Sequence, residues 1–243
     1  MVTPPISLPL TPAAIQPAIS KEERRQRWFE VFLVLAISLG MALLNSFYLL
    51  NSPPTSPLRM SALRSVYGIA HEVLSLFLLA YVLSRRNLGF RDLGLRSSRR
   101  DVVPSFVVTV LAGLSYVVGA LLVQALHYEL YGAIAHGTRA NQYFSNPSIW
   151  ALPFSLLNPF FEELIVRAYV MTEIKELTGS TLLAILLSVL LQASYHLYYG
   201  WVGALSVAFP FMVFAIYYGR SRRVVPLIVA HAAFDLYGLV GLM

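Results

Sequence analysis

Six ionisable side chains interrupt the apolar segments in the second half of this chain. They are Glu162, Glu163, Arg167, His196, His231 and Asp235. A charge near the centre of a bilayer costs about 2.5–3.5 kcal/mol on insertion scales. We therefore expect these side chains to face the protein interior and to pair with one another or with other polar groups.

Their spacing predicts two pairs, each on one helix face. Glu163 and Arg167 are four residues apart, and so are His231 and Asp235. Side chains at this spacing lie next to each other on an α-helix, and an ion pair between Glu163 and Arg167 is expected. Glu162 projects about 100° further round the helix, which leaves it available for other chemistry.

The depth of these residues in the membrane predicts a common site. Glu162 precedes Thr178 by sixteen residues, and His196 follows Thr181 by fifteen. If the helices on either side of this polar turn are antiparallel, a rise of ~1.5 Å per residue brings the two side chains to one level. His231 follows Arg223 by eight residues, which places it near the same level.

Glutamate, histidine and aspartate together can hydrolyse a peptide bond in two ways. A glutamate beside a histidine can take a proton from water, while the second histidine hydrogen-bonds the oxyanion. Alternatively, a divalent metal such as zinc activates the water. Its candidate ligands are Glu162, His196, His231 and Asp235. The chain has no cysteine and neither a Gly-x-Ser-x-Gly nor a His-Glu-x-x-His motif, so the usual serine-hydrolase and zincin signatures are absent.

The composition indicates that the elements positioning these residues are membrane helices. Of 243 residues, 57% are hydrophobic and 12% charged, against roughly 25% charged in soluble domains. Apolar segments of about spanning length occur seven times. They are 28–50, 62–83, 102–126, 149–172, 181–199, 201–219 and 224–243. The sequence thus predicts an all-α integral membrane bundle of seven helices, or eight if 127–160 adds a further piece.

The fourth helix is expected to be broken, with one part ending near Asn158 and the next starting at Pro159. Proline suits the first turn of a helix, because its missing N–H would be unpaired there. Broken helices occur in membranes where protein or a polar cavity covers the bare backbone. The break therefore points to a site in this helix.

The basic residues predict a cytoplasmic N-terminus. That orientation leaves only Arg59 and Arg139 on the opposite side, as the positive-inside rule requires. The net charge is +6, but the charged residues fall between the apolar segments rather than along one face, which argues against nucleic-acid binding. Segment 84–101 is basic and is expected to rest on anionic headgroups.

We divide the chain into a disordered basic tail (1–27), N-terminal transmembrane helices (28–144) and a catalytic core (145–243).

The core resembles the CAAX protease and bacteriocin-processing (CPBP) family, which includes the type II CAAX prenyl endopeptidases. The resemblance rests on three motifs in order, Glu162-Glu163-x-x-x-Arg167, His196 and His231-x-x-x-Asp235. It implies that Glu162 activates water with help from His196, supported by Glu163 and Arg167. It also implies that His231 and Asp235 stabilise the oxyanion or hold a metal. The chain departs from the family pattern at two positions. Gln192 stands four residues before His196, where the family usually has phenylalanine, and Asp235 stands where the family often has asparagine.

Each motif taken alone has a simpler structural interpretation. Glu163 and Arg167 can join helices as an ion pair, His196 can be an interfacial residue, and His231 with Asp235 can be a hydrogen-bonded pair. Three more polar residues on one face of the second helix are expected to line the bundle. They are Arg64, His71 and Glu72.

The leading interpretation is an intramembrane endopeptidase of a prokaryotic plasma membrane, acting on a peptide or protein at the bilayer. The alternatives are a non-catalytic scaffold or immunity protein of the same family, and a proton-coupled transporter. Metal dependence, the natural substrate, the oligomeric state and the side from which substrate enters stay open at this stage.

Overall fold

The chain folds into packed helices. The computed structural model describes residues 19–51, 61–135 and 147–240, and every regular element in these ranges is helical. The elements are α1 (Lys21–Asn51), α2 (Ala62–Ser84), η1 (Arg99–Asp101), α3 (Val102–Tyr131), α5 (Ala151–Glu162), η2 (Glu163–Val170), α6 (Met171–Thr178), α7 (Thr181–Tyr195), η3 (Leu197–Tyr199), α8 (Gly200–Ser221) and α9 (Val225–Val240). Here η2 is a π-helix, and η1 and η3 are short 3-10 turns.

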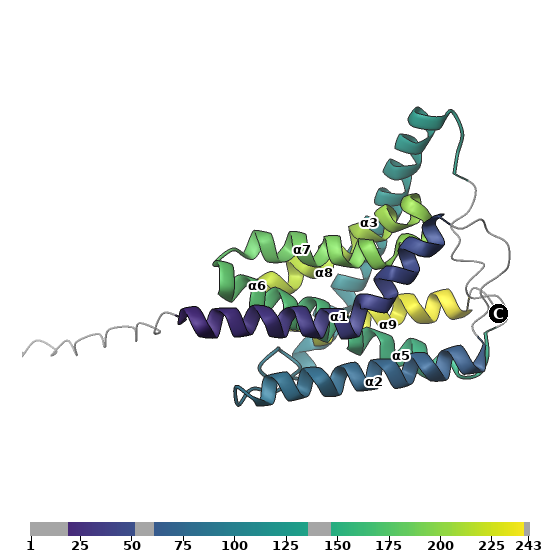
Figure 1. Ribbon diagram of the computed structural model, residues 1–243. Helices are drawn as coiled ribbons and strands as arrows, with labels where there is room; N and C mark the ends of the chain where they lie inside the picture. Colours follow the sequence, from purple (N-terminus) through teal and green to yellow (C-terminus); the bar gives the residue numbers. More distant parts are fainter. Residues whose placement is uncertain (1–18, 52–60, 136–146, 241–243) are drawn as a thin grey trace, which may run out of the picture.

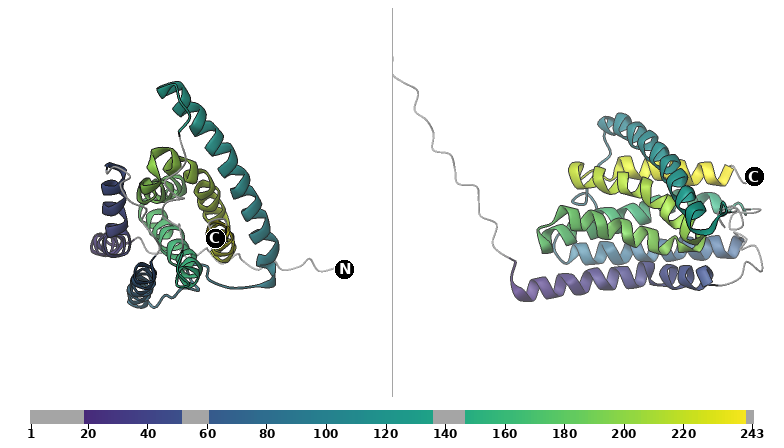
Figure 2. Two further views of the ribbon diagram at one scale, coloured as in Figure 1. Left: turned by 90° about the vertical axis from the view of Figure 1, so that its right-hand side faces the viewer. Right: turned by 90° about the horizontal axis from the view of Figure 1, so that it is seen from above.

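Most helices lie side by side along one direction, and α3 is inclined across the bundle (Figures 1 and 2). The continuous helix α5–η2–α6 lies at the centre, and all eight residues of η2 are buried. Two glycines allow neighbouring helices to pack closely. Helix α2 approaches α5 at Gly68, where an added Cβ would meet the Phe154 ring at 2.5 Å. At Gly119, α3 lies equally close to Phe209 of α8.

The predicted break in the fourth helix is wrong. Helix α5 continues through Asn158 and Pro159, and Pro159 is buried inside it. A proline inside a helix removes one backbone hydrogen bond without requiring the helix to end. In an apolar environment helix is the form that still pairs the remaining backbone groups, so the chain stays helical. The irregularity lies instead at Glu163–Val170, where the helix widens to π geometry.

Among the described residues, four helices are long and apolar enough to cross a membrane, namely α1, α2, α3 with η1, and α8 with η3. They contain the predicted spans 28–50, 62–83, 102–126 and 201–219. Helices α7 and α9 are apolar but shorter, with 15 and 16 residues. The protein is an integral membrane protein. The count of seven or eight spans stays a prediction, and 136–146, within the segment proposed for an eighth, lie outside the described residues.

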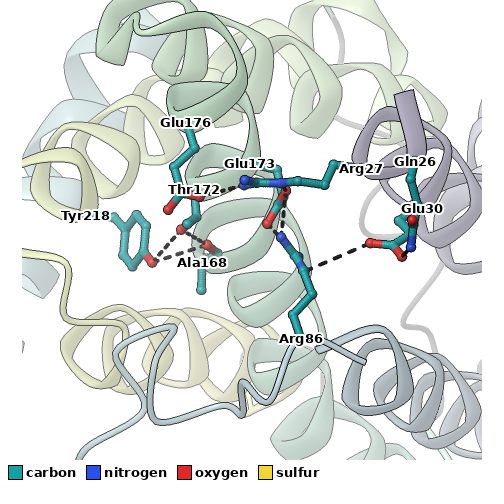
Figure 3. Close-up of polar contacts among 9 residues, drawn as sticks. All are labelled: Gln26, Arg27, Glu30, Arg86, Ala168, Thr172, Glu173, Glu176 and Tyr218. Atoms are coloured by element: carbon teal, nitrogen blue, oxygen red, sulfur yellow. Dashed lines mark hydrogen bonds and ion pairs between the residues drawn. The ribbon is translucent and has the colours of Figure 1, made fainter. Parts of the chain in front are cut away.

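The N-terminal tail was predicted to be disordered as far as residue 27, but the helix begins earlier. Residues 1–18 lie outside the described residues, but α1 begins at Lys21, so 21–27 are helical. Arg27 is buried because its guanidinium pairs with Glu173 at 2.8 Å and with Glu176 at 2.5 Å on α6. Figure 3 shows Arg86 reaching the same Glu173 carboxylate, at 2.8 Å. This network ties α1 and the segment after α2 to the helix that carries the site.

Candidate active site

Glu162 is held by side chains from two helices. The hydroxyl of Tyr195 donates to its Oε2 at 2.7 Å, and the amide nitrogen of Gln192 donates to the same oxygen. Asn158, one turn earlier on α5, donates to Oε1 at 3.3 Å. An ionised carboxylate has about four acceptor positions. Three donors therefore fix its orientation and leave capacity for another hydrogen bond.

Glu163 and Arg167 form the expected pair, with Arg167 Nε 3.7 Å from Glu163 Oε2 and both side chains fully buried. Their further contacts divide between two catalytic candidates. Glu163 Oε1 lies 2.8 Å from Nδ1 of His231 on α9. Arg167 Nη1 donates at 2.5 Å to Gln192, the residue that holds Glu162. Glu163 thus contacts His231 rather than Glu162, while Arg167 reaches Glu162 through the Gln192 amide.

Both histidines have one ring nitrogen occupied. Nδ1 of His196 lies 2.8 Å from the Gln192 carbonyl oxygen, which can only accept, so the proton lies on Nδ1. In His231, Nδ1 faces Glu163. Its Nε2 lies 4.0 Å from Glu162 Oε2 and 3.7 Å from Asp235 Oδ1. In each ring, Nε2 is the nitrogen left for a further partner.

These residues surround one cavity of about 360 Å³. Glu162, His196, His231 and Asp235 all line it, from α5, the end of α7, and α9. The residues predicted to share a depth in the membrane therefore lie around a common space. Its wall also includes Asn158 and Tyr195, so polar groups converge in a pocket formed among apolar helices.

The second helix contributes more than the sequence indicated. His71 and Glu72 line the same cavity, and Glu72 is buried with no hydrogen-bond partner for its Oε2. His71 Nε2 lies 3.2 Å from the carbonyl oxygen of Ile37 on α1. Arg64, expected on the same face, is exposed and does not line the cavity.

Sequence reasoning missed three residues around Glu162, namely Asn158, Tyr195 and the bridging role of Gln192. A signal existed for Asn158, which precedes Glu162 by four residues, the spacing of neighbours on a helix face. Gln192 and Tyr195 carry no such signal, because their contacts with Glu162 join two different helices.

The donor atoms do not gather into a metal-binding set. Within the ranges that the structure describes, no group of three or more His, Asp and Glu side chains is arranged to hold an ion. Hydrogen-bond donors occupy part of the Glu162 carboxylate, and in each histidine the engaged Nδ1 holds the ring in place while Nε2 is left for a further partner. These side chains are arranged to position one another.

Residues 144–237 match the family model described as type II CAAX prenyl endopeptidase Rce1-like. This match confirms the resemblance predicted from the three motifs, and it covers the elements that form the cavity except α1 and α2. Neither the curated proteins nor the solved structures that were compared include a match to this chain.

Proposed function

We propose, from the membership of residues 144–237 in the Rce1-like type II CAAX prenyl endopeptidase family, that this protein is an intramembrane endopeptidase. The observation that carries the proposal is the fixed Glu162 carboxylate, which lines a cavity together with two histidines. A family of proteases supports peptide-bond hydrolysis as the reaction class. The substrate is a peptide or protein that reaches the site from the bilayer.

Glu162 acts as the general base. Its carboxylate accepts a proton from a water molecule in the cavity, and the water oxygen attacks the carbonyl carbon of the scissile bond. The carbonyl oxygen becomes an oxyanion in the tetrahedral intermediate. The carbon–nitrogen bond then breaks, and the proton held by Glu162 passes to the departing amine nitrogen. Tyr195 and Gln192 keep the carboxylate aimed throughout.

The histidines assist through Nε2. His196, with its proton fixed on Nδ1, can accept a hydrogen bond from the attacking water at Nε2. His231 is oriented by Glu163 and lies between Glu162 and Asp235, so its Nε2, when protonated, can donate to the oxyanion. Asp235 acts here by orienting His231, the role that suits an acid in place of the family's frequent asparagine.

A fluorescence cleavage assay tests this proposal. The full chain in nanodiscs is given a quenched-fluorescent peptide library, and wild type is compared with Glu162→Gln and His196→Ala. Removing a general base is expected to lower the cleavage rate by roughly 10²–10⁴-fold. Glu129→Gln, at an exposed position of α3, is the matched control and should retain the full rate. A thermal unfolding curve of each variant establishes that it is folded.

Three outcomes bear on the alternatives. Cleavage that persists in Glu162→Gln overturns the mechanism. No cleavage by folded wild type, with a stable complex formed with another membrane protein, favours the scaffold or immunity function. Proton uptake into vesicles that depends on Glu162 favours a transporter. A chelator arm is included, and loss of wild-type cleavage on chelation would establish metal dependence.

We further propose that the N-terminus is cytoplasmic and that the membrane is a prokaryotic plasma membrane. The basic residues near the start of α1 and between α2 and α3 support this orientation, since cytoplasmic loops carry an excess of Lys and Arg.

A further inference from the structure

Four arginines from two distant parts of the chain line a second pocket, of about 310 Å³, at the basic end of the bundle. Arg91 and Arg96 lie between α2 and α3, while Arg222 and Arg223 form the turn between α8 and α9. Ser98 adds a hydroxyl to the wall. The polar groups of this pocket belong to neither the catalytic cavity nor the Figure 3 network.

The two walls of this arginine pocket are fastened together. The glycine at Gly94 has φ +93°, and an added Cβ would lie 2.1 Å from the Arg222 carbonyl oxygen, so the backbones meet directly. The Tyr218 hydroxyl donates to the carbonyl oxygen of Leu93 at 3.0 Å. Arg223 pairs with Asp101 at 2.7 Å. The pocket is therefore formed by fixed backbone rather than by chance proximity of long side chains.

The arginine pocket carries uncompensated positive charge. Asp101 neutralises Arg223, and Asp92 lies 3.8 Å from Arg96. Among the described residues, no carboxylate lies within ion-pair distance of Arg91 or Arg222, and the Arg222 guanidinium rests on the Tyr218 ring. Four guanidinium groups and two carboxylates leave a net charge of +2. Such a pocket is complementary to a phosphate, which arginine binds through paired hydrogen bonds.

An apolar groove of about 470 Å³ continues from the arginine pocket between α3 and α9. Ser98 lines both spaces, and the groove extends along α3 to Thr109, eight residues or on the order of 12 Å beyond Asp101. The hydroxyls of Ser105 and Thr109 donate to carbonyl oxygens of their own helix. The groove is therefore mainly apolar beyond Asp101, which lines its start and pairs with Arg223.

Beyond Thr109 the groove meets a larger apolar chamber of about 690 Å³, which Thr109 also lines. The lining of this chamber also includes His196, His231 and Asp235. A positively charged pocket, a narrow apolar groove and an apolar chamber thus follow one another from the end of the bundle towards the candidate active site.

We propose that the arginine pocket and the α3–α9 groove bind an anionic phospholipid, with its phosphate among the arginines and an acyl chain along the groove. Basic pockets at the cytoplasmic side of membrane helices bind such headgroups. A phospholipid has a charged headgroup followed by apolar chains, which matches the charged pocket followed by the apolar groove. A soluble anion matches only the arginine pocket. The lipid site does not depend on the peptidase proposal, because it uses none of the residues that perform the reaction.

Binding of dioleoylphosphatidylglycerol to the purified full chain in detergent, counted by native mass spectrometry, tests the proposal. Arg91→Gln/Arg222→Gln removes the two unpaired guanidinium groups. At about 1 kcal/mol for each arginine, affinity should fall roughly 30-fold. Arg99→Gln/Arg100→Gln changes the net charge equally at exposed positions outside the pocket lining. The affinity of this control for the phospholipid should fall less than about threefold, because contacts within the pocket dominate binding. An equal loss in both variants overturns the proposal.

Two further arms identify the ligand. Val229→Trp fills the groove and should weaken binding of the phospholipid but not of glycerol phosphate, whereas Val103→Trp, exposed on α3 outside the groove, should change neither. Binding of dioleoylphosphatidylcholine as tight as that of the phosphatidylglycerol would contradict an anion site. Inorganic phosphate that binds as tightly as the lipid would contradict a site for an amphiphile.

Discussion

At the scale of single residues, the candidate active site is a set of buried charges that lie next to one another. Glu163 and Arg167 have no exposed surface. Removing one partner of such a pair leaves the other charge buried without compensation, which costs far more than the pair contributes. The contacts of Glu163 with His231 and of Arg167 with Gln192 make the same residues responsible for both stability and geometry.

We predict that Glu163→Gln and Arg167→Met each destabilise the protein by ~3–5 kcal/mol. The double variant should cost at least ~1 kcal/mol less than the sum, because residues in contact are not additive. Thermal unfolding of the detergent-solubilised variants measures all three. The control is Arg96→Gln in the pair with Asp92, whose side chains are 70% and 47% exposed, and it should cost under ~1 kcal/mol. Simple additivity of the two buried substitutions would contradict this account.

At the scale of elements, the helix that carries the site depends on neighbours at both ends. The π-helix η2 places eight buried residues in sequence between Glu162 and α6, and such segments are frequent at functional sites. Its α6 end is fastened to α1 and to Arg86 through Glu173 (Figure 3). Removing the Glu173 carboxylate should therefore alter the orientation of the whole α5–η2–α6 helix.

We predict that Glu173→Gln lowers the free energy of unfolding by ~3 kcal/mol or more, because Glu173 is 2% exposed and pairs with both Arg27 and Arg86. Glu176 also pairs with Arg27, but its side chain is 49% exposed. Glu176→Gln should therefore cost less than ~1 kcal/mol. Denaturation curves of the two variants compare them, and equal losses would show that burial does not govern this network.

The contact between α3 and α8 makes a second prediction at this scale. A methyl group at Gly119 would lie 2.4 Å from the Phe209 ring, so Gly119→Ala should cost ~1–3 kcal/mol by overpacking. At Gly113, in the same helix, the nearest atom would be 3.8 Å away. There alanine should instead stabilise by up to ~1 kcal/mol, since it favours helix over glycine. The melting temperatures should therefore shift in opposite directions, and parallel shifts would contradict the close packing.

At the scale of the whole molecule, the membrane determines how charge is distributed. The arginine pocket and the Figure 3 network lie near one end of the bundle, where Arg24 and Arg27 contact α6 and the segment after α2 meets the α8–α9 turn. By the positive-inside rule, we expect this end of the bundle to face the cytoplasm.

Because the chain has no cysteine, its orientation can be mapped with single introduced thiols. Arg99→Cys and Ile134→Cys lie just before and just after α3, at exposed positions. We predict that a membrane-impermeant maleimide added outside intact cells labels position 134 and not position 99. In inverted vesicles the pattern should reverse. Labelling of position 99 from outside would contradict a cytoplasmic N-terminus, and labelling of both from one side would contradict α3 as a membrane span.

Much of this protein follows from local sequence. Long apolar segments form helices in a membrane whatever their neighbours, because each helix pairs its own backbone groups. The four-residue spacings of Glu163 with Arg167 and of His231 with Asp235 likewise depend on one helix each. The three motifs in order were enough to predict the resemblance that the family model over residues 144–237 confirms, since such a resemblance is read from residue types and their sequence spacing.

The partners between helices depend on packing and could not be read from spacing. Glu163 contacts His231, and Gln192 bridges Arg167 to Glu162, because helix rotation and the π geometry of η2 place them so. Helix α5 continues through Pro159 because helix still pairs the remaining backbone groups in an apolar environment, although proline alone favours a break. Glu72 lines the cavity because α2 packs against α5. Contacts within a helix are set by its period, whereas contacts between helices require the three-dimensional arrangement.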